Sequence, residues 1–140
     1  MAQVSTKSTQ NDTVLLITDI QVGRDGSIGD YRVEVKRMDL ECAIRVCGFM
    51  SDGFGAFFES LDESMTREGG WPELKTWASL EGEFSLAASS DSLGHTNLIA
   101  TLKSGPYDHD WSVEVGILLD ASQLSELARS ARRALEPAAA

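Results

Sequence analysis

Hydrophobic and polar residues alternate along several stretches of the chain, which is the pattern of a strand buried on one face. A β-branched apolar run adds one more such stretch near the N-terminus. Strands are therefore predicted over residues 14–20, 31–36, 40–46, 84–88, 98–102 and 111–119. In two other stretches the apolar side chains recur at offsets of three, four and seven, the spacing of one helix face. Amphipathic helices are therefore predicted over 54–65 and 124–135.

Residues at the borders of the two helical stretches match known capping signals. Ser51 or Asp52 can cap the first helix, and Gly69-Gly70 can end it. Asp120 can cap the second helix, and Gln123 stands where a capping box needs Glu or Gln. The sequence therefore predicts where both helices begin and where the first one ends.

The predicted elements follow the order βββ-α-βββ-α, which favours an α+β fold. We expect one antiparallel sheet of about six strands with two helices packed against it. A half-barrel of the same strands around the first helix is the alternative. The segment Trp71–Trp77 is expected to form one helical turn or an ordered loop. A single domain is predicted over 14–136, with a disordered polar tail at 1–13 and a frayed tail at 137–140.

Length and composition are those of an ordinary soluble domain, with 140 residues, 42% hydrophobic and 24% charged. The longest apolar runs, such as Val14–Ile17, are far shorter than the roughly 18 residues of a membrane span. The first thirteen residues lack the apolar region of a secretory signal. Cys42 and Cys47 lie five positions apart in one predicted strand, too far for a disulfide. We therefore expect a cytoplasmic protein without membrane contact.

The chain is strongly acidic, with 22 Asp and Glu against 12 Lys and Arg and a net charge of −10. This balance argues against binding to nucleic acid, because phosphate contacts need clustered cations. The excess lies within residues 49–120, which hold 13 acidic and three basic side chains. Either this is a solvated surface that maintains solubility, or it is a negative face that steers a cationic partner into contact.

The second interpretation predicts a partner-binding surface on the first helix and the segment after it. Aromatic anchors ringed by carboxylates are typical of a site for a basic protein. The tryptophans could equally be lids over the core, and Trp111 is expected to be one. The predicted partner-binding residues are Glu59, Asp62, Glu63, Glu68, Trp71 and Glu73, with Trp77 beside them.

Candidate catalytic residues are scarce. His95 follows Asp91 at a predicted hairpin, and a carboxylate beside a histidine can tune it as a base. The competing interpretation is that Asp91 only stabilises the turn. The sequence contains no Gly-x-Ser-x-Gly, Cys-x-x-Cys or phosphate-binding Gly-rich motif. It therefore indicates no catalytic set, metal site or cofactor, and enzymatic activity is left open.

Three stretches together resemble a known family. They are the phenylalanine-rich helix leading through Gly70-Trp71 to Gly82, the sequence Asp91-x-x-Gly-His95, and the strand Trp111–Leu119 with its Asp-x-x-Gln-Leu ending. The pattern resembles a domain-of-unknown-function family of small actinobacterial proteins, over roughly residues 30–135. That family is similar to WapI-type immunity proteins, which neutralise the nuclease domain of a contact-delivered toxin.

The resemblance implies an inhibitor that acts by binding and has no catalytic residues to carry over. Nuclease domains are usually basic, and an acidic inhibitor gains association rate from the opposite charge. The leading hypothesis is therefore a non-catalytic, immunity-type inhibitor that occludes a basic toxin domain. The alternative is a small-molecule-binding or enzymatic α+β domain with a cavity between sheet and helix, and with Asp91 and His95 at its mouth.

Overall fold

The computed structural model describes residues 3–48, 53–105, 107 and 110–136. Eight strands and two helices are found in this part of the chain. In chain order they are β1 (Val4–Lys7), β2 (Val14–Thr18), β3 (Asp30–Arg37), β4 (Leu40–Cys47), α1 (Phe54–Glu68), β5 (Lys75–Ala78), β6 (Phe84–Ser90), β7 (Thr96–Lys103), β8 (Ser112–Leu119) and α2 (Ala121–Ala134).

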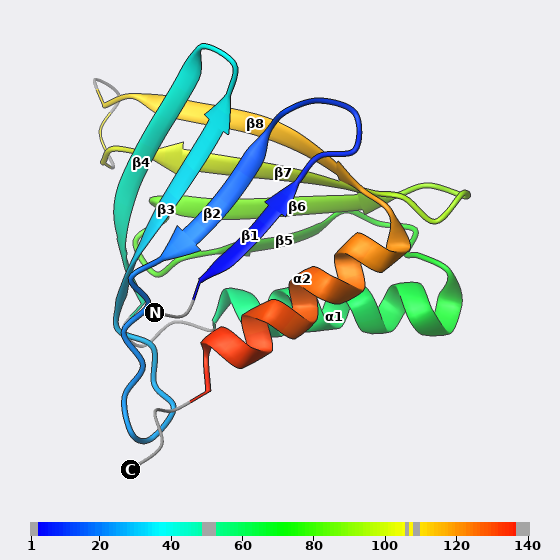
Figure 1. The fold of residues 1–140 in the computed structure, drawn as a ribbon, viewed down its shortest axis with the longest axis horizontal. Helices are drawn as coiled ribbons and strands as arrows, with labels where there is room; N and C mark the ends of the chain where they lie inside the picture. The colour runs from blue at the N-terminus through cyan, green and yellow to red at the C-terminus, as the bar shows by residue number, and fades with distance from the viewer. Residues whose placement is uncertain (1–2, 49–52, 106, 108–109, 137–140) are drawn as a thin grey trace.

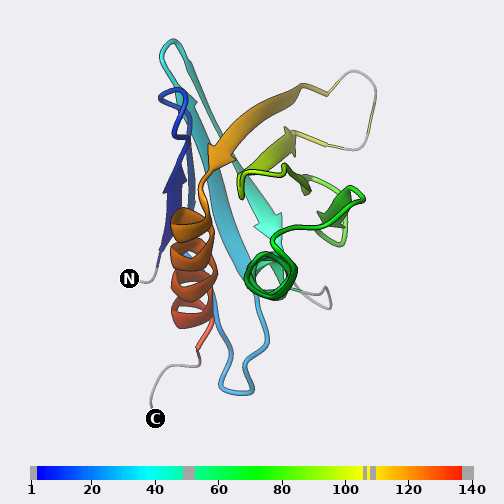
Figure 2. The ribbon, with the colours of Figure 1, turned by 90° about the vertical axis from the view of Figure 1, so that its right-hand side faces the viewer.

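The strands form two antiparallel sheets, in the orders β1-β2-β3-β4 and β5-β6-β7-β8. The α+β class is confirmed, but the prediction of one sheet of about six strands is wrong. The chain leaves β4 through α1 before it reaches β5, and no strand ladder joins the two sheets in the described residues. Figures 1 and 2 show the sheets as two layers and the two helices side by side, with α2 lying against β1.

The strand β1 lies within the first thirteen residues, which were expected to be disordered. It pairs with β2 from Val4 opposite Ile17 to Lys7 opposite Val14. The chain after β1 is also bonded, since the backbone N–H of Thr9 donates to the Leu118 carbonyl at 2.8 Å. With only four residues and two buried positions, β1 is too short to give a clear alternation.

The segment Trp71–Trp77 is neither a helical turn nor only a loop, because its last part belongs to β5. This strand pairs with β6 from Lys75 opposite Ala88 to Ala78 opposite Ser85. Its inward side chains are only half-buried. A four-residue strand of this kind leaves little hydrophobic pattern in the sequence.

Both predicted helices are confirmed. Gly69 ends α1 in the left-handed region, with φ of 75°. Ser51 and Asp52, the expected caps of α1, lie outside the described residues, and Gly53 is the N-cap. In α2 the predicted capping box is present: the Gln123 N–H donates to the Asp120 carboxylate at 2.8 Å, and the Asp120 N–H donates to the Gln123 side chain at 3.1 Å.

The core lies between the two sheets and the helices. Tyr31 of β3 packs edge-on against Phe54 of α1 and Phe84 of β6, with ring centroids 5.1 and 6.5 Å apart. Trp77 of β5 reaches Phe84 at 5.4 Å. These rings connect the two sheets through α1. Within the described residues, neither helix is both long and apolar enough to cross a membrane.

The capping box makes α2 sensitive to acid. Hydrogen bonds from Gln123 and Ser122 lower the pKa of Asp120 below its usual value. The ionised carboxylate therefore contributes stability above the unfolded-state pKa, and this contribution is lost as the pH falls through the folded-state pKa. We expect Asp120→Ala to lower the free energy of unfolding by about 1 kcal/mol at neutral pH. Urea titration at neutral pH and near pH 2 measures this, and the difference should shrink in acid. Asp120→Asn, which keeps the acceptor, is the control.

The hydroxyl of Thr96 has no hydrogen-bond partner in the described structure, although the residue is fully buried. A buried hydroxyl without a partner costs about 1–3 kcal/mol. Thr96→Val should therefore raise the melting temperature and the free energy of unfolding, the latter by about 1 kcal/mol. Thr101→Val, on the outer face of the same strand, should change little. A destabilised Thr96→Val protein would instead show that this hydroxyl is satisfied in solution.

Candidate binding cleft

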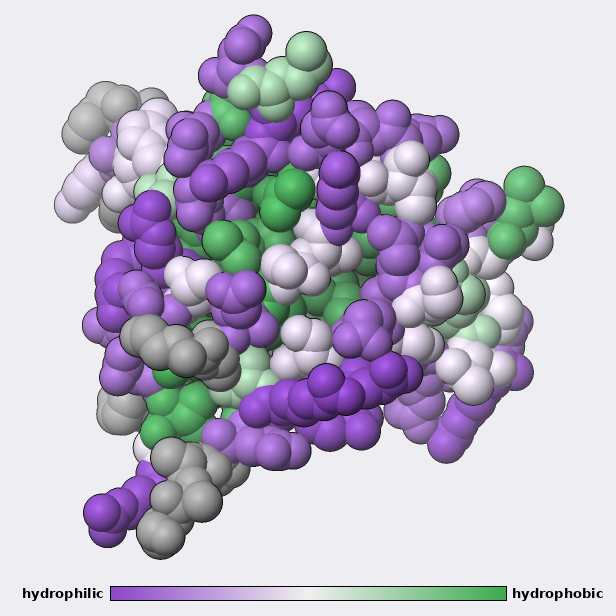
Figure 3. All heavy atoms as spheres, viewed as in Figure 1, coloured by the Kyte–Doolittle hydropathy of each residue, from purple (hydrophilic) through white to green (hydrophobic). Residues whose placement is uncertain are grey.

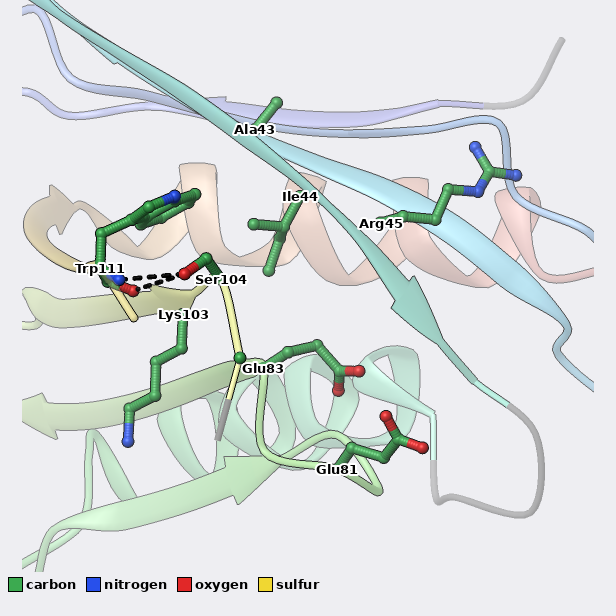
Figure 4. A pocket seen from close by; sticks show the side chains of 9 residues that line it. Ala43, Ile44, Arg45, Glu81, Glu83, Lys103, Ser104 and Trp111 are labelled. Carbon is green, nitrogen blue, oxygen red and sulfur yellow. Dashed lines mark hydrogen bonds between the residues drawn. The ribbon is translucent and has the colours of Figure 1, made fainter. Parts of the chain in front are cut away.

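A cleft of about 810 Å³ opens between the edge of β4 and the adjacent ends of the second sheet. Figure 4 shows Ile44 pointing into it from β4, Glu83 reaching in from the turn before β6, and the ring of Trp111 at the other side. The remaining lining residues are Ala43, Arg45, Glu81, Lys103, Ser104 and Gly105. Figure 3 shows hydrophobic residues over the middle of the face formed by β1–β4 and hydrophilic residues around them.

Trp111 is fixed through its backbone while its ring stays accessible. Its N–H donates to the Ser104 hydroxyl at 3.0 Å, and its carbonyl accepts from the Ser104 N–H at 3.0 Å. The residue is 44% exposed, so the expectation that it is a core lid is wrong. Trp111 lies one position before β8. It is an even number of residues from the inward-facing Val115 and Ile117, so the alternation along the strand would direct it inward, but it lies at the mouth of the cleft.

Three carboxylates line the same cleft as this tryptophan or the hollow beside it. Glu81 and Glu83 come from the β5–β6 turn, where the Ser79 hydroxyl donates to the Glu83 carboxylate. A neighbouring hollow of about 480 Å³ shares Glu81 and Trp111 and adds Asp110 and the exposed Tyr107. The Asp110 carboxylate accepts from the Tyr107 N–H at 3.0 Å. Two exposed aromatic side chains and three acidic side chains thus line these two neighbouring hollows.

Two cations also line the cleft. Arg45 lies 3.7 Å from the Asp19 carboxylate, which partly neutralises its charge. Lys103 has no ion-pair partner in the described part of the chain. Nearby, burial raises the pKa of the Tyr31 hydroxyl, with smaller contributions from the charges of Glu83 and Cys47.

The acidic residues predicted on α1 are largely engaged with other parts of the protein. Glu59 accepts a hydrogen bond from the Arg132 guanidinium of α2, which raises the pKa of that guanidinium. Asp62 accepts from the Ser125 hydroxyl of α2 at 2.5 Å. These two carboxylates bridge the helices.

The rest of the predicted partner-binding surface is divided. Glu63 forms an ion pair with Arg67 at 2.9 Å, one turn along α1. Glu68 and Trp71 line a hollow of about 370 Å³, and Glu73 is exposed in the segment that follows.

Trp71 is a lid over the core and not an exposed anchor. It is 8% exposed, and its indole N–H donates to the Ala88 carbonyl at 3.0 Å. Its backbone N–H donates to the Ser90 hydroxyl at 2.8 Å. Of the residues predicted to bind a partner, only Glu68 and Glu73 are exposed side chains without a salt bridge in the described residues.

Asp91 and His95 lie together in the β6–β7 hairpin. One Asp91 oxygen accepts from the N–H groups of Leu93 and His95, each at 2.9 Å, and the other lies 3.0 Å from His95 Nδ1. The bond from the His95 backbone is the main cause of the lowered pKa of Asp91. Both residues line an open hollow of about 700 Å³ beside the loop of residues 8–11. The geometry of Asp91 is that of a residue that stabilises the turn.

Sequence reasoning missed Trp111, Glu81 and Glu83 as site residues. The available signal was the position of Trp111 between a turn and a strand, which is where a side chain reaches the rim of a sheet. Among the described residues, no cluster of three or more His, Cys, Asp or Glu side chains could hold a metal ion.

Comparison with known proteins gives one match. No curated protein and no solved structure shows significant similarity to the chain. A family model, described as a family of unknown function (DUF6228), matches residues 5–138, which confirms the resemblance to a domain of unknown function. Because this match spans nearly the whole chain, the protein belongs to the DUF6228 family of unknown function.

Proposed function

We propose that this protein is a non-catalytic, immunity-type inhibitor that binds a basic protein domain, such as a nuclease toxin domain, at the Trp111 cleft. The observation that carries the proposal is an accessible tryptophan that lines one cleft with Glu81 and Glu83 and a neighbouring hollow with Asp110. Tryptophan is the residue type most enriched among interface hot spots, and carboxylates favour a partner rich in Lys and Arg.

The rigidity of the site supports this function. Ser104 is hydrogen-bonded to both the N–H and the carbonyl of Trp111, and the Ser79 hydroxyl is hydrogen-bonded to the Glu83 carboxylate. A partner therefore loses little binding free energy to the ordering of the Trp111 backbone and the Glu83 carboxylate. An arginine placed on the Trp111 ring could also make a cation–π contact while pairing with a neighbouring carboxylate.

The acidic net charge supports it as well. The side chains of Glu59, Asp62 and Glu63 are engaged within the protein, so we place the docking surface at the cleft and not on α1. Glu68 and Glu73 stay exposed and add to the negative field. Such a field raises the association rate with a cationic partner and is screened by salt.

A second candidate function rests on the size of the cleft. Its volume of about 810 Å³ is within the range of small-molecule sites, and Trp111 offers a stacking surface. This differs from the cavity between sheet and helix that the sequence suggested, because β4 and the ends of the second sheet form the walls. Tight binding of a metabolite that is independent of added basic protein would favour this alternative.

Removal of the Trp111 ring should weaken the complex. With a panel of purified, catalytically inactive basic nuclease domains, we expect Trp111→Ala to reduce the affinity of any domain that binds by about tenfold or more. Calorimetric titration measures this change. Leu93→Ala, at the exposed β6–β7 hairpin, is the matched control and should bind like the parent protein. Equal affinity of the Trp111→Ala and parent proteins would refute the proposed docking site.

Charge reversal at the cleft should act mainly on the association rate. Glu81→Lys should slow association by about threefold or more at low salt, and the effect should shrink as salt rises. Glu114→Lys makes the same change of charge on the exposed outer face of β8 and should slow association less. Stopped-flow kinetics at two salt concentrations compare the two. Equal slowing by both variants would mean that only net charge matters.

A further inference from the structure

Within the described residues, the backbone groups on the outer edge of β4 have no hydrogen-bond partner. β4 pairs with β3 throughout, and Arg37 opposite Leu40 closes a two-residue hairpin. The closing pair of such a hairpin is hydrogen-bonded, and bonded and non-bonded residue pairs alternate along an antiparallel ladder. The N–H and C=O groups of Glu41, Ala43 and Arg45 therefore point away from β3. At the other end of the hairpin the Gly48 N–H donates to the Gly29 carbonyl at 3.1 Å. This bonded pair falls where the alternation counted from Arg37 and Leu40 predicts one.

The Trp111 cleft lies along this edge. Ala43, Ile44 and Arg45 form one wall of it, and Glu83 and Trp111 stand across from them. Figure 4 shows β4 passing over the open space, with Ile44 and Trp111 directed into it. A strand added next to β4 would lie about 4.8 Å away from it and would therefore occupy the cleft.

We infer that the first sheet binds an extended segment of a basic partner as a fifth strand along β4. The inference rests on the proposed function and adds how the partner docks. Backbone bonds to Ala43 and Arg45 would supply affinity independent of sequence, and side chains pointing into the cleft would supply specificity. A cationic side chain of the segment is complementary to Glu81 and Glu83 and can stack on Trp111.

The other sheet edges fit this role less well. β1 and β5 are only four residues long. β8 is as long as β4, but Leu118 near its end is already bonded to Ser8 and Thr9, at 3.0 and 2.8 Å. In the described residues, β4 is the long edge that combines free backbone groups with a cleft of about 810 Å³.

The probe for this inference is a labelled octapeptide that alternates arginine and valine, with a glutamate–valine peptide as the charge control. We expect the parent protein to bind the arginine peptide and Trp111→Ala to bind it more weakly. N-methylation of alternate peptide residues should abolish binding, because it removes the donors that face β4. Fluorescence anisotropy measures all of these affinities.

Two matched variants of the protein test the edge directly. Ala43→Pro removes an N–H that points away from β3 and should weaken peptide binding by about tenfold. Ala78→Pro makes the same substitution at the outer edge of β5. Ala78 is next to Ser79, whose N–H donates to Phe84 of β6, so the Ala78 N–H points away from β6. This control should change the affinity by less than about twofold.

Amide hydrogen exchange in the unmodified protein provides a readout that does not depend on how the proline variants fold. Peptide binding should slow exchange at Ala43 and Arg45 by about tenfold or more. Equal exchange with and without bound peptide, no binding by the parent protein, or full binding by a folded Ala43→Pro protein would overturn strand addition. Protection of these amides at high protein concentration without peptide would show a second copy at the edge and would also overturn it.

The two proposals fail in different ways. If the nuclease-domain affinity depends on Trp111 but Ala43→Pro binds the peptide as the parent does, the docking site stands and strand addition is wrong. If the nuclease-domain affinity is independent of Trp111 while the peptide still protects Ala43, the proposed site for the basic domain is wrong and the edge binds peptides on its own.

Discussion

The fold depends on one aromatic cluster that the two sheets and α1 bury together. No strand ladder connects the sheets in the described residues, so apart from the bonds of Ser8 and Thr9 to Leu118, side-chain packing holds them against each other. Tyr31, Phe54 and Phe84 make the central contacts, one from each of β3, α1 and β6. Apolar burial holds the two layers face to face, and no ladder pairs β4 with a strand of the second sheet in the described residues. The cleft lies beside this edge of β4.

Contacts within the protein decide which acidic residues are available to a partner. A net charge of −10 on 140 residues creates repulsion within the folded chain. The helices reduce it locally, because Arg132 and Ser125 of α2 face Glu59 and Asp62 of α1. Arg132 and Arg133 also stand in the last turn of α2, where cations complement the helix dipole. The acidic side chains that share the hollows with Trp111 are on turns and loops. Among the described residues, Arg45 of β4 and Lys103 of β7 are the cations that line the cleft.

How much could be predicted from the sequence depended on the length of each element. Both helices and the capping box of Asp120 and Gln123 were predictable because the pattern persists over several turns. The strands β1 and β5 were not, since a four-residue strand offers only two inward positions. The number of sheets was also missed. Alternation shows that one face of a strand is buried, but it carries no information about which strand lies beside it.

The two tryptophans show why the site itself could not be predicted. Trp71 and Trp111 are the same residue type, but Trp71 has the Ala88 carbonyl 3.0 Å from its indole N–H and is buried with that polar group satisfied. Trp111 has the parity of an inward residue but precedes the sheet, where the opposite layer covers only part of it. Each exposed apolar Å² forgoes roughly 25 cal/mol of burial free energy. A partner that covers the Trp111 ring would recover this free energy, which is why the proposed docking site is centred on this partly exposed ring.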